Sequence, residues 1–302
     1  MGQHHDHHHH HIDNYNRAFA IGLILNIGFV IVELIFGYLA NSMALIADAW
    51  HNLSDVAGLL LAWLAYYMGK KAANQRYTYG FRRASILASL FSALLLLFAL
   101  GGISWEALQR LQNPQDLQSG YIIWVAAIGF IINTATALLF VKGQHHDLNL
   151  KGAYLHMAAD AAVSIGVVIS GILISFTHWL WLDPVVSLII VLVILLGTWH
   201  LLKESGLLAL DGVPEKIELE AVKNYLLAQP GVTNLHDLHV WALGTTDIAM
   251  TVHLEITDNC NADELLHKIS HDLHDDFDIE HCTVQLESGN GHCHLNRPNC
   301  VH

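Results

Sequence analysis

Residues 44–68, ALIADAWHNLSDVAGLLLAWLAYYM, decide how this sequence folds. The segment is long and apolar enough to cross a lipid bilayer, because a spanning helix needs about 20 residues at about 1.5 Å each. It nevertheless contains three ionisable side chains, Asp48, His51 and Asp55. Each costs on the order of 3 kcal/mol at bilayer depth. These residues are therefore candidates for function.

The whole chain has a membrane composition: 302 residues, of which 53% are hydrophobic and only 14% charged. An average soluble domain has about a quarter charged residues. The formal net charge of −13 also argues against a general affinity for nucleic acid. We predict an all-α bundle of six membrane-spanning helices, with Asp183 and Pro184 as the N-cap and first residue of the sixth. The predicted spans are 18–39, 44–68, 85–107, 121–141, 152–176 and 182–202.

Lysine and arginine in the short loops predict the orientation, because they are enriched on the cytoplasmic side. Only Arg110 falls in the loops of one side. The other side, which we therefore expect to be cytoplasmic together with both termini, has nine: Arg17, Lys70, Lys71, Arg76, Arg82, Arg83, Lys142, Lys151 and Lys203. The protein is predicted to be a multi-pass membrane protein.

After Lys203 the composition changes, since residues 204–302 contain 17 of the 27 acidic residues. Helical and alternating apolar patterns predict the order αββαβ, a small α+β sheet domain with two helices on one face. We expect helices at 215–228 and 263–276, and strands at 233–243, 248–256 and 279–287. The predicted domains are a histidine-rich cytoplasmic tail, 1–16, a membrane domain, 17–203, a cytoplasmic domain, 204–288, and a Cys/His tail, 289–302.

The pattern H-x-x-x-D occurs in the middle of two predicted spans, as His51 and Asp55 in the second and as His156 and Asp160 in the fifth. Residues four apart lie on one face of a helix. Brought face to face, the two pairs offer two imidazoles and two carboxylates. That set suits Zn²⁺, with Cd²⁺, Co²⁺ or Ni²⁺ also possible.

Two other interpretations of polar residues in the spans stay open. Each histidine could simply hydrogen-bond an aspartate and hold helices together, although that role does not require matched spacing. Asp48 could instead cap a helix or hydrate the ion path. Asn26 and Glu33 share a face of the first span, and Glu33 is either a second titrating group or a carboxylate bonded to a neighbouring helix.

These motifs resemble those of the cation diffusion facilitator family, and the resemblance covers nearly the whole chain. NIGFVIVE resembles the family's N-x-x-x-x-x-x-E in span one, ADAWHNLSD its A-D-A-x-H-x-x-x-D in span two, and HMAAD its H-x-x-x-D in span five. HDLHVW and HCTVQLE resemble its C-terminal motifs. Two features differ: the loop YTYGFRRAS has no histidine or acid for a second ion, and Ser85 stands where the family often has an acid.

The resemblance implies a homodimer in a bacterial inner membrane that exports Zn²⁺ in exchange for protons by alternating access. Metal binding should release protons, because bound ligands are deprotonated. The resemblance also implies that His51, Asp55, His156 and Asp160 form the transport site. It matches His236, His253 and His281 to a regulatory zinc site between subunits, with Glu287 as a further candidate. The alternative for these last residues is ordinary surface charge.

Other histidines and cysteines could bind metal in the soluble parts. His145 and His146, before the fifth span, could deliver metal to it, and Cys293 and Cys300 near the C-terminus could hold zinc or copper(I) weakly. The run from His4 to His11 is either an expression tag or a native metal-gathering tail.

Two other functions are alternatives to transport. An intramembrane metalloenzyme is disfavoured because H-E-x-x-H is absent and span two offers no general base placed beside two zinc-binding histidines. We therefore expect no enzymatic activity. The other alternative is a non-transporting, membrane-anchored zinc sensor or partner subunit, which the intact pairs on both spans disfavour.

Overall fold

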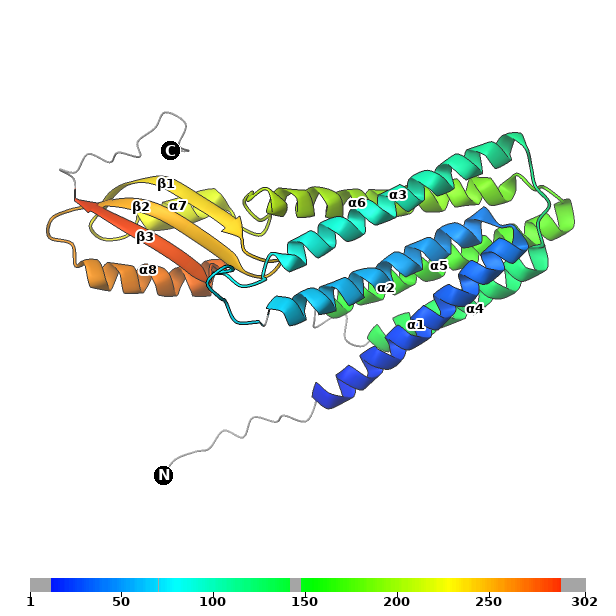
Figure 1. Ribbon diagram of the computed structural model, residues 1–302, viewed down its shortest axis with the longest axis horizontal. Helices are drawn as coiled ribbons and strands as arrows, with labels where there is room; N and C mark the ends of the chain where they lie inside the picture. The colour runs from blue at the N-terminus through cyan, green and yellow to red at the C-terminus, as the bar shows by residue number, and fades with distance from the viewer. Residues whose placement is uncertain (1–11, 70, 142–147, 289–302) are drawn as a thin grey trace, which may run out of the picture. The chain divides into compact units, whose positions relative to one another are not determined.

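The computed structural model describes residues 12–69, 71–141 and 148–288. Six long helices come first and correspond to the six predicted spans (Figure 1). A three-stranded sheet with two helices follows. The fold class predicted from the sequence is confirmed. The long helices are α1 (Ile12–Ala40), α2 (Met43–Gly69), α3 (Ala84–Gln112), α4 (Ser119–Phe140), α5 (Leu148–Thr177) and α6 (Leu182–Ala209).

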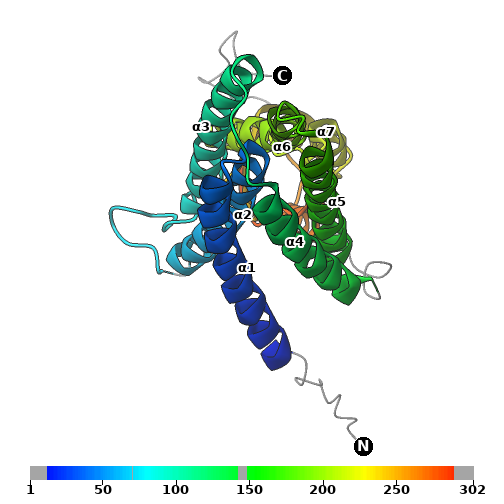
Figure 2. The ribbon, with the colours of Figure 1, turned by 90° about the vertical axis from the view of Figure 1, so that its right-hand side faces the viewer.

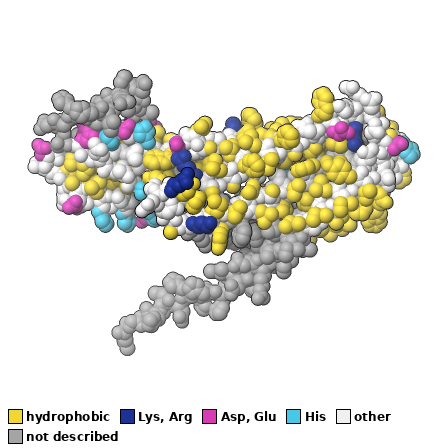
Figure 3. Space-filling model, in the orientation of Figure 1, with side chains coloured by type: hydrophobic (Ala, Val, Ile, Leu, Met, Phe, Trp, Pro, Cys, Tyr) yellow, Lys and Arg dark blue, Asp and Glu magenta, His cyan; other side chains and the backbone are white. Residues whose placement is uncertain are grey.

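Four described helical stretches are long and apolar enough to cross a membrane by length and hydropathy alone: Ala84–Gln112, Ser119–Leu138, Tyr154–Thr177 and Leu182–Ala209. The described part of α1 contains a shorter apolar stretch, Asn26–Ala40. Large apolar side chains on the outside of these helices are exposed, as Phe98 shows at 84%. Figure 3 shows such side chains covering the helices on the visible face, which is the surface that lipid requires.

Small residues let the helices approach closely. Figure 2 shows α4 beside both α1 and α5. A Cβ added to Gly129 on α4 would lie 2.6 Å from Phe29 Cζ of α1, and one added to Gly171 on α5 would lie 2.9 Å from Ile123 of α4. Real Cβ atoms do not approach that closely, so both glycines are required for the packing, as small residues commonly are between membrane helices.

The expected role of Asp183 as N-cap of the sixth span is wrong. α6 begins at Leu182, so Asp183 is already inside its first turn. The Asp183 carboxylate instead accepts hydrogen bonds at the start of α2, from the Met43 N–H at 2.7 Å, from the Ala44 N–H at 3.4 Å and from the Ser42 hydroxyl. A buried carboxylate from one helix therefore caps another, a contact between distant segments that local spacing does not reveal.

The C-terminal domain has the predicted order αββαβ: α7 (Leu219–Leu227), β1 (Val232–Ala242), β2 (Ile248–Ile256), α8 (Ala262–Phe277) and β3 (His281–Ser288). The strand order is β1-β2-β3, with β2 antiparallel to β1 and parallel to β3. α7 and α8 contact each other, and both contribute to one apolar core with the strands. Beside this core, burial and then Asp272, whose carboxylate accepts a 2.6 Å hydrogen bond from Tyr225, raise the pKa of Tyr225 above its usual value.

The loop between α2 and α3 contacts the C-terminal domain. Arg82 lies 3.2 Å from Asp247 and 3.6 Å from Glu280. The Ser85 hydroxyl accepts a 3.0 Å hydrogen bond from the Thr245 N–H. A Cβ added to Gly244 would come within 3.1 Å of the Arg82 carbonyl oxygen. Ser85, where related sequences often have an acid, is therefore used here as a hydrogen-bonding partner of the β1–β2 turn.

We expect Asp183→Ala to destabilise the protein by about 2 kcal/mol, because it leaves backbone donors of α2 buried without an acceptor. In detergent the melting temperature should fall by about 4–8 °C. Asp183→Asn, which keeps one acceptor oxygen, should lose less, and the exposed Asp116→Ala should melt like the unmodified protein. An unchanged melting temperature for Asp183→Ala would contradict the capping role.

Candidate functional site

The two H-x-x-x-D pairs meet across α2 and α5. The His51 Nε2 atom lies 3.2 Å from Asp160 Oδ1 and 3.7 Å from Asp55 Oδ2. The His156 Nε2 atom lies 3.2 Å from Asp55 Oδ2 and 3.6 Å from Asp160 Oδ2. The two imidazole centroids are 5.9 Å apart. Each carboxylate thus contacts both imidazoles, and the four side chains form a closed ring.

The size of this ring suits a tetrahedral metal ion. With Zn–N and Zn–O bonds of about 2.0–2.1 Å, neighbouring ligand atoms in a tetrahedron are about 3.3 Å apart. The four nitrogen–oxygen distances of 3.2–3.7 Å lie close to that value, but Asp160 contacts the two imidazoles through different oxygens. With one ligand atom from each residue, His51, Asp55 and Asp160 lie within 4.8 Å of one another, and His156 lies outside that group. Two carboxylates and two neutral imidazoles would also balance the charge of a divalent ion. The chemistry of the set favours zinc or a similar borderline cation.

Within each H-x-x-x-D pair, one side chain is more exposed to solvent than the other. On α5 the His156 side chain is 43% exposed and Asp160 only 4%, while on α2 Asp55 is 28% exposed and His51 17%. Asp55 is the member of its pair nearer the C-terminal end of α2, and His156 is the member nearer the N-terminal end of α5. Asp55 and His156 are therefore the members of the ring that are most open to solvent.

A second polar layer lies one helical turn from the ring, on the side of Asp160. Glu33 of α1 and Asp48 of α2 are both fully buried, and they are near enough to interact electrostatically. The Asn52 amide donates a 3.0 Å hydrogen bond to Glu33. Glu33 is thus bonded to a neighbouring helix, which was one of its two predicted roles. Asn26 is half-buried on α1 and, among the described residues, makes no side-chain hydrogen bond.

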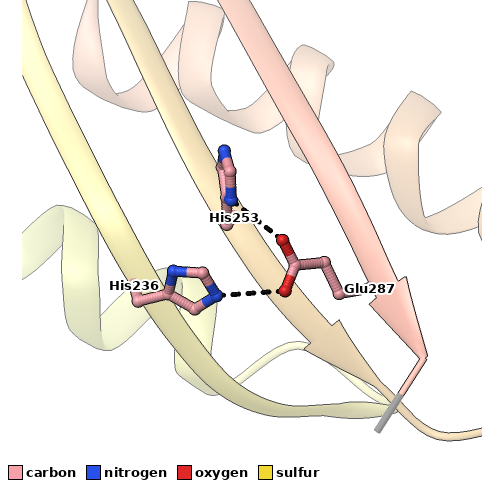
Figure 4. Close-up of side chains that lie close together, drawn as sticks. All are labelled: His236, His253 and Glu287. Carbon is pink, nitrogen blue, oxygen red and sulfur yellow. Dashed lines mark hydrogen bonds and ion pairs between the residues drawn. The ribbon is translucent and has the colours of Figure 1, made fainter. Parts of the chain in front are cut away.

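A second candidate metal site lies on the sheet of the C-terminal domain (Figure 4). The Glu287 carboxylate of β3 lies 3.1 Å from His236 Nε2 of β1 and 2.9 Å from His253 Nδ1 of β2. One ligand atom from each of these residues lies within 4.8 Å of the others. All three side chains are at most 13% exposed. Two imidazoles and a carboxylate in a sheltered position fit a zinc ion and leave its fourth coordination position free.

The pairing of the strands brings these residues together. His236 and His253 are directly opposite in the antiparallel β1–β2 ladder. Glu287 pairs with Glu255, two residues beyond His253, and therefore on the same face. A bulge at Asp237, whose φ is 54°, separates His236 from His239. His236 is buried at the site, whereas His239 is exposed and contacts Asp237 at 2.9 Å.

Within one chain the structure does not bring His281 to this site. His281 is at the start of β3, opposite Ala249, six positions before Glu287. At about 3.3 Å per residue this places it roughly 20 Å from Glu287. Its ring packs against Tyr79 of the α2–α3 loop at 5.4 Å. The strand length therefore separates two residues that the family resemblance had grouped.

Several candidates from the sequence fall outside the described residues: His145, His146, Cys293, Cys300 and the N-terminal histidine run. Conversely, the structure adds two polar residues to the list. Asp237, whose carboxylate is 3.8 Å from His253 Nε2, is flagged in the sequence only by its place in HDLH. Asn52, the hydrogen-bond partner of Glu33, directly follows His51, but nothing in its sequence position indicates this role.

Comparison with known proteins matches both parts of the chain to one family. The cation efflux transmembrane domain matches residues 19–208, and the cytoplasmic domain of cation efflux proteins matches residues 214–289. The chain belongs to the cation diffusion facilitator family. Members of this family are metal transporters and not enzymes, and this cation diffusion facilitator is a multi-pass membrane protein.

Relatives align with the chain along most of their length. The metal cation efflux system protein CzcD of Cupriavidus metallidurans is 40% identical over 90% of this chain and 86% of its own. The zinc transporter ZitB of Escherichia coli is 34% identical over 94% and 92%. The cadmium, cobalt and zinc/H⁺-K⁺ antiporter of Bacillus subtilis is 32% identical over 99% and 96%.

One solved structure also resembles part of this cation diffusion facilitator. It is the metal-bound C-terminal domain of the CzcD transporter from Cupriavidus metallidurans, which is 39% identical. The alignment covers 24% of this chain and 99% of the solved chain, with a TM-score of 0.23.

We expect His253→Ala and Glu287→Ala each to weaken zinc binding at the C-terminal site by at least tenfold, because each removes a direct ligand. Calorimetry on the full chain carrying Asp160→Ala, which impairs the ring on α2 and α5, isolates this site. His239→Ala is the matched control, since His239 is near the site but exposed. His281→Ala should change the affinity less than threefold, and a loss as large as that of His253→Ala would contradict a site built from one chain.

Proposed function

We propose that this protein is a secondary transporter that exports Zn²⁺ from the cytoplasm in exchange for protons by alternating access. The observation that carries the proposal is the ring of His51, Asp55, His156 and Asp160. Its nitrogen–oxygen distances of 3.2–3.7 Å are close to the edge length of a zinc tetrahedron, and His51, Asp55 and Asp160 offer ligand atoms within 4.8 Å of one another. Cd²⁺, Co²⁺ and Ni²⁺ are alternative substrates, and the names of the relatives include cadmium and cobalt.

The graded exposure of the ring supports entry of the ion from the cytoplasm. The loops that follow α2 and precede α5 contain six of the 14 lysines and arginines, so these helix ends are assigned to the cytoplasmic side. Asp55 and His156 are the accessible members of each pair and face those ends. The fully buried layer of Glu33 and Asp48 lies on the opposite side. This arrangement corresponds to a conformation open to the cytoplasm and closed to the outside.

The exchange with protons follows from the ligands. With Zn²⁺ in the ring, two carboxylates and two neutral imidazoles sum to no net charge. When the ion leaves, two carboxylates remain in a poorly hydrated site, where protons taken up by the two facing imidazoles restore the charge balance. Protons and metal therefore compete for the same four side chains, and each return of the empty site carries protons inward.

The C-terminal domain is proposed to be cytoplasmic and to take part in a homodimer, as the family of its matching domain suggests. His236, His253 and Glu287 are proposed to hold a resident zinc ion there. Bound zinc would tie all three strands together, because one ligand comes from each strand. We propose that this ion makes the domain responsive to cytoplasmic zinc.

We expect His51→Ala and Asp160→Ala to reduce zinc flux into proteoliposomes at least a hundredfold, because each removes two of the four contacts of the ring. The assay uses vesicles with a zinc-sensitive dye inside and a pH gradient across the membrane. His200→Ala, an exposed histidine on α6, is the control and should transport normally.

A pH-sensitive dye in the same vesicles should report protons moving opposite to zinc. Zinc flux without proton movement would exclude the exchange. Unchanged flux in Asp160→Ala would exclude the ring as the transport site. Proteoliposomes that bind zinc at the C-terminal domain but carry out no transport would instead support the sensor alternative.

A further inference from the structure

We propose that Glu33 and Asp48 form a second, metal-free ion site that holds one shared proton. This inference rests on the proposed proton exchange and names a carrier for it other than the metal ligands. The pair joins α1 to α2 one helical turn from the ring, on its closed side.

Within the described part of the chain, several buried oxygens around Glu33 and Asp48 lack hydrogen-bond partners. Glu33, Asp48 and the neighbouring Ser164 of α5 are all fully buried. Both Asp48 oxygens, Glu33 Oε1 and Ser164 Oγ lack a hydrogen-bond partner among the described residues. Ionised carboxylates can only accept hydrogen bonds, so two of them in contact cannot satisfy each other. One added proton turns either acid into a donor, and the two carboxyl groups then bond directly.

Charge also favours a shared proton. Two negative charges close together at a buried position repel strongly, and a pair of acids in that situation keeps one proton between them. Two charged or titratable groups face the pair: His51 of α2 and Asp160 of α5. These two lie 3.2 Å apart and neutralise each other, so they do not supply a counter-charge for Glu33 and Asp48. Asn52 adds only a neutral donor to Glu33.

The acid pair lies on the side of the ring away from the exposed residues. Zinc reaches the ring past Asp55 and His156, whereas the acid pair lies beyond Asp160 in the buried layer. A proton that enters from the outside therefore meets the pair before it meets the ring. Asp48 and His51 are three residues apart on one face of α2, which leaves a short step between the two sites. The pair can pass a proton to the ring as zinc departs.

Infrared spectroscopy of the full-length, metal-free protein tests the shared proton. At neutral pH the protein should show the carbonyl stretch of a protonated carboxylic acid. Glu33→Gln and Asp48→Asn should each abolish this band, because the new amide donates to the remaining carboxylate, which then needs no proton. Glu33→Gln can still accept the hydrogen bond from Asn52. Glu106→Gln, an exposed acid on α3, should leave the band unchanged.

Three outcomes overturn the proposal: no band in the unmodified protein, a band that persists in Glu33→Gln, or a band that persists in Asp48→Asn. Melting temperatures within a few degrees of the unmodified protein verify that the variants fold. If a variant does not fold, the double variant Glu33→Gln/Asp48→Asn, which has two neutral amides and no buried charge, takes its place. Persistence of the band in the double variant would also overturn the proposed shared proton.

Transport separates this proposal from the proposed function. Glu33→Gln should bind zinc at the ring with an affinity within about threefold of the unmodified protein, but a pH gradient should accelerate its zinc flux less than twofold. Loss of zinc binding in Glu33→Gln, or full acceleration by the gradient, contradicts a proton carrier separate from the ring. A different result would contradict the proposed function, namely zinc flux that persists in Asp160→Ala.

Discussion

The cost of placing charge away from water governs where this protein keeps its ionisable groups. In the described helices the buried ones occur in sets. The ring joins two imidazoles to two carboxylates, and the Asp183 carboxylate is bonded to the free N–H groups at the start of α2. Glu33 and Asp48 face each other. In each set a carboxylate lies against a hydrogen-bond donor or a positive group, or it needs a bound proton or metal ion to balance its charge.

The same residues hold the helices in place. The ring connects α2 to α5, Asp183 connects α6 to α2, and the Glu33–Asn52 bond connects α1 to α2. α2 takes part in every one of these contacts. In a bilayer, apolar surface gives little preference for one helix neighbour over another, because lipid is equally apolar. Polar contacts to α2 therefore determine which helices surround the site.

Much of the fold was predictable because it depends on neighbouring residues in the sequence. Hydropathy over about 20 residues predicted all six long helices, and alternation predicted β2 at its observed bounds. The ring was predictable because spacing of four residues reports one helix face. The arrangement of distant segments could not be predicted in this way. Asp183 contacts the start of α2, and His281 is separated from Glu287 by the length of β3. Sequence spacing shows which residues share a face of a helix or strand, but it does not show which other segment packs against that face.

The close fit of Gly171 against Ile123 has a consequence for how the ring can change. α4 and α5 are in contact there with no space for a side chain, so α5 is more easily moved together with α4 than away from it. Both α5 members of the ring, His156 and Asp160, belong to that same helix. A displacement of the pair of helices relative to α2 would change all four ring contacts together. Release of the ion would then be cooperative, and half-open sites with two or three ligands would be short-lived.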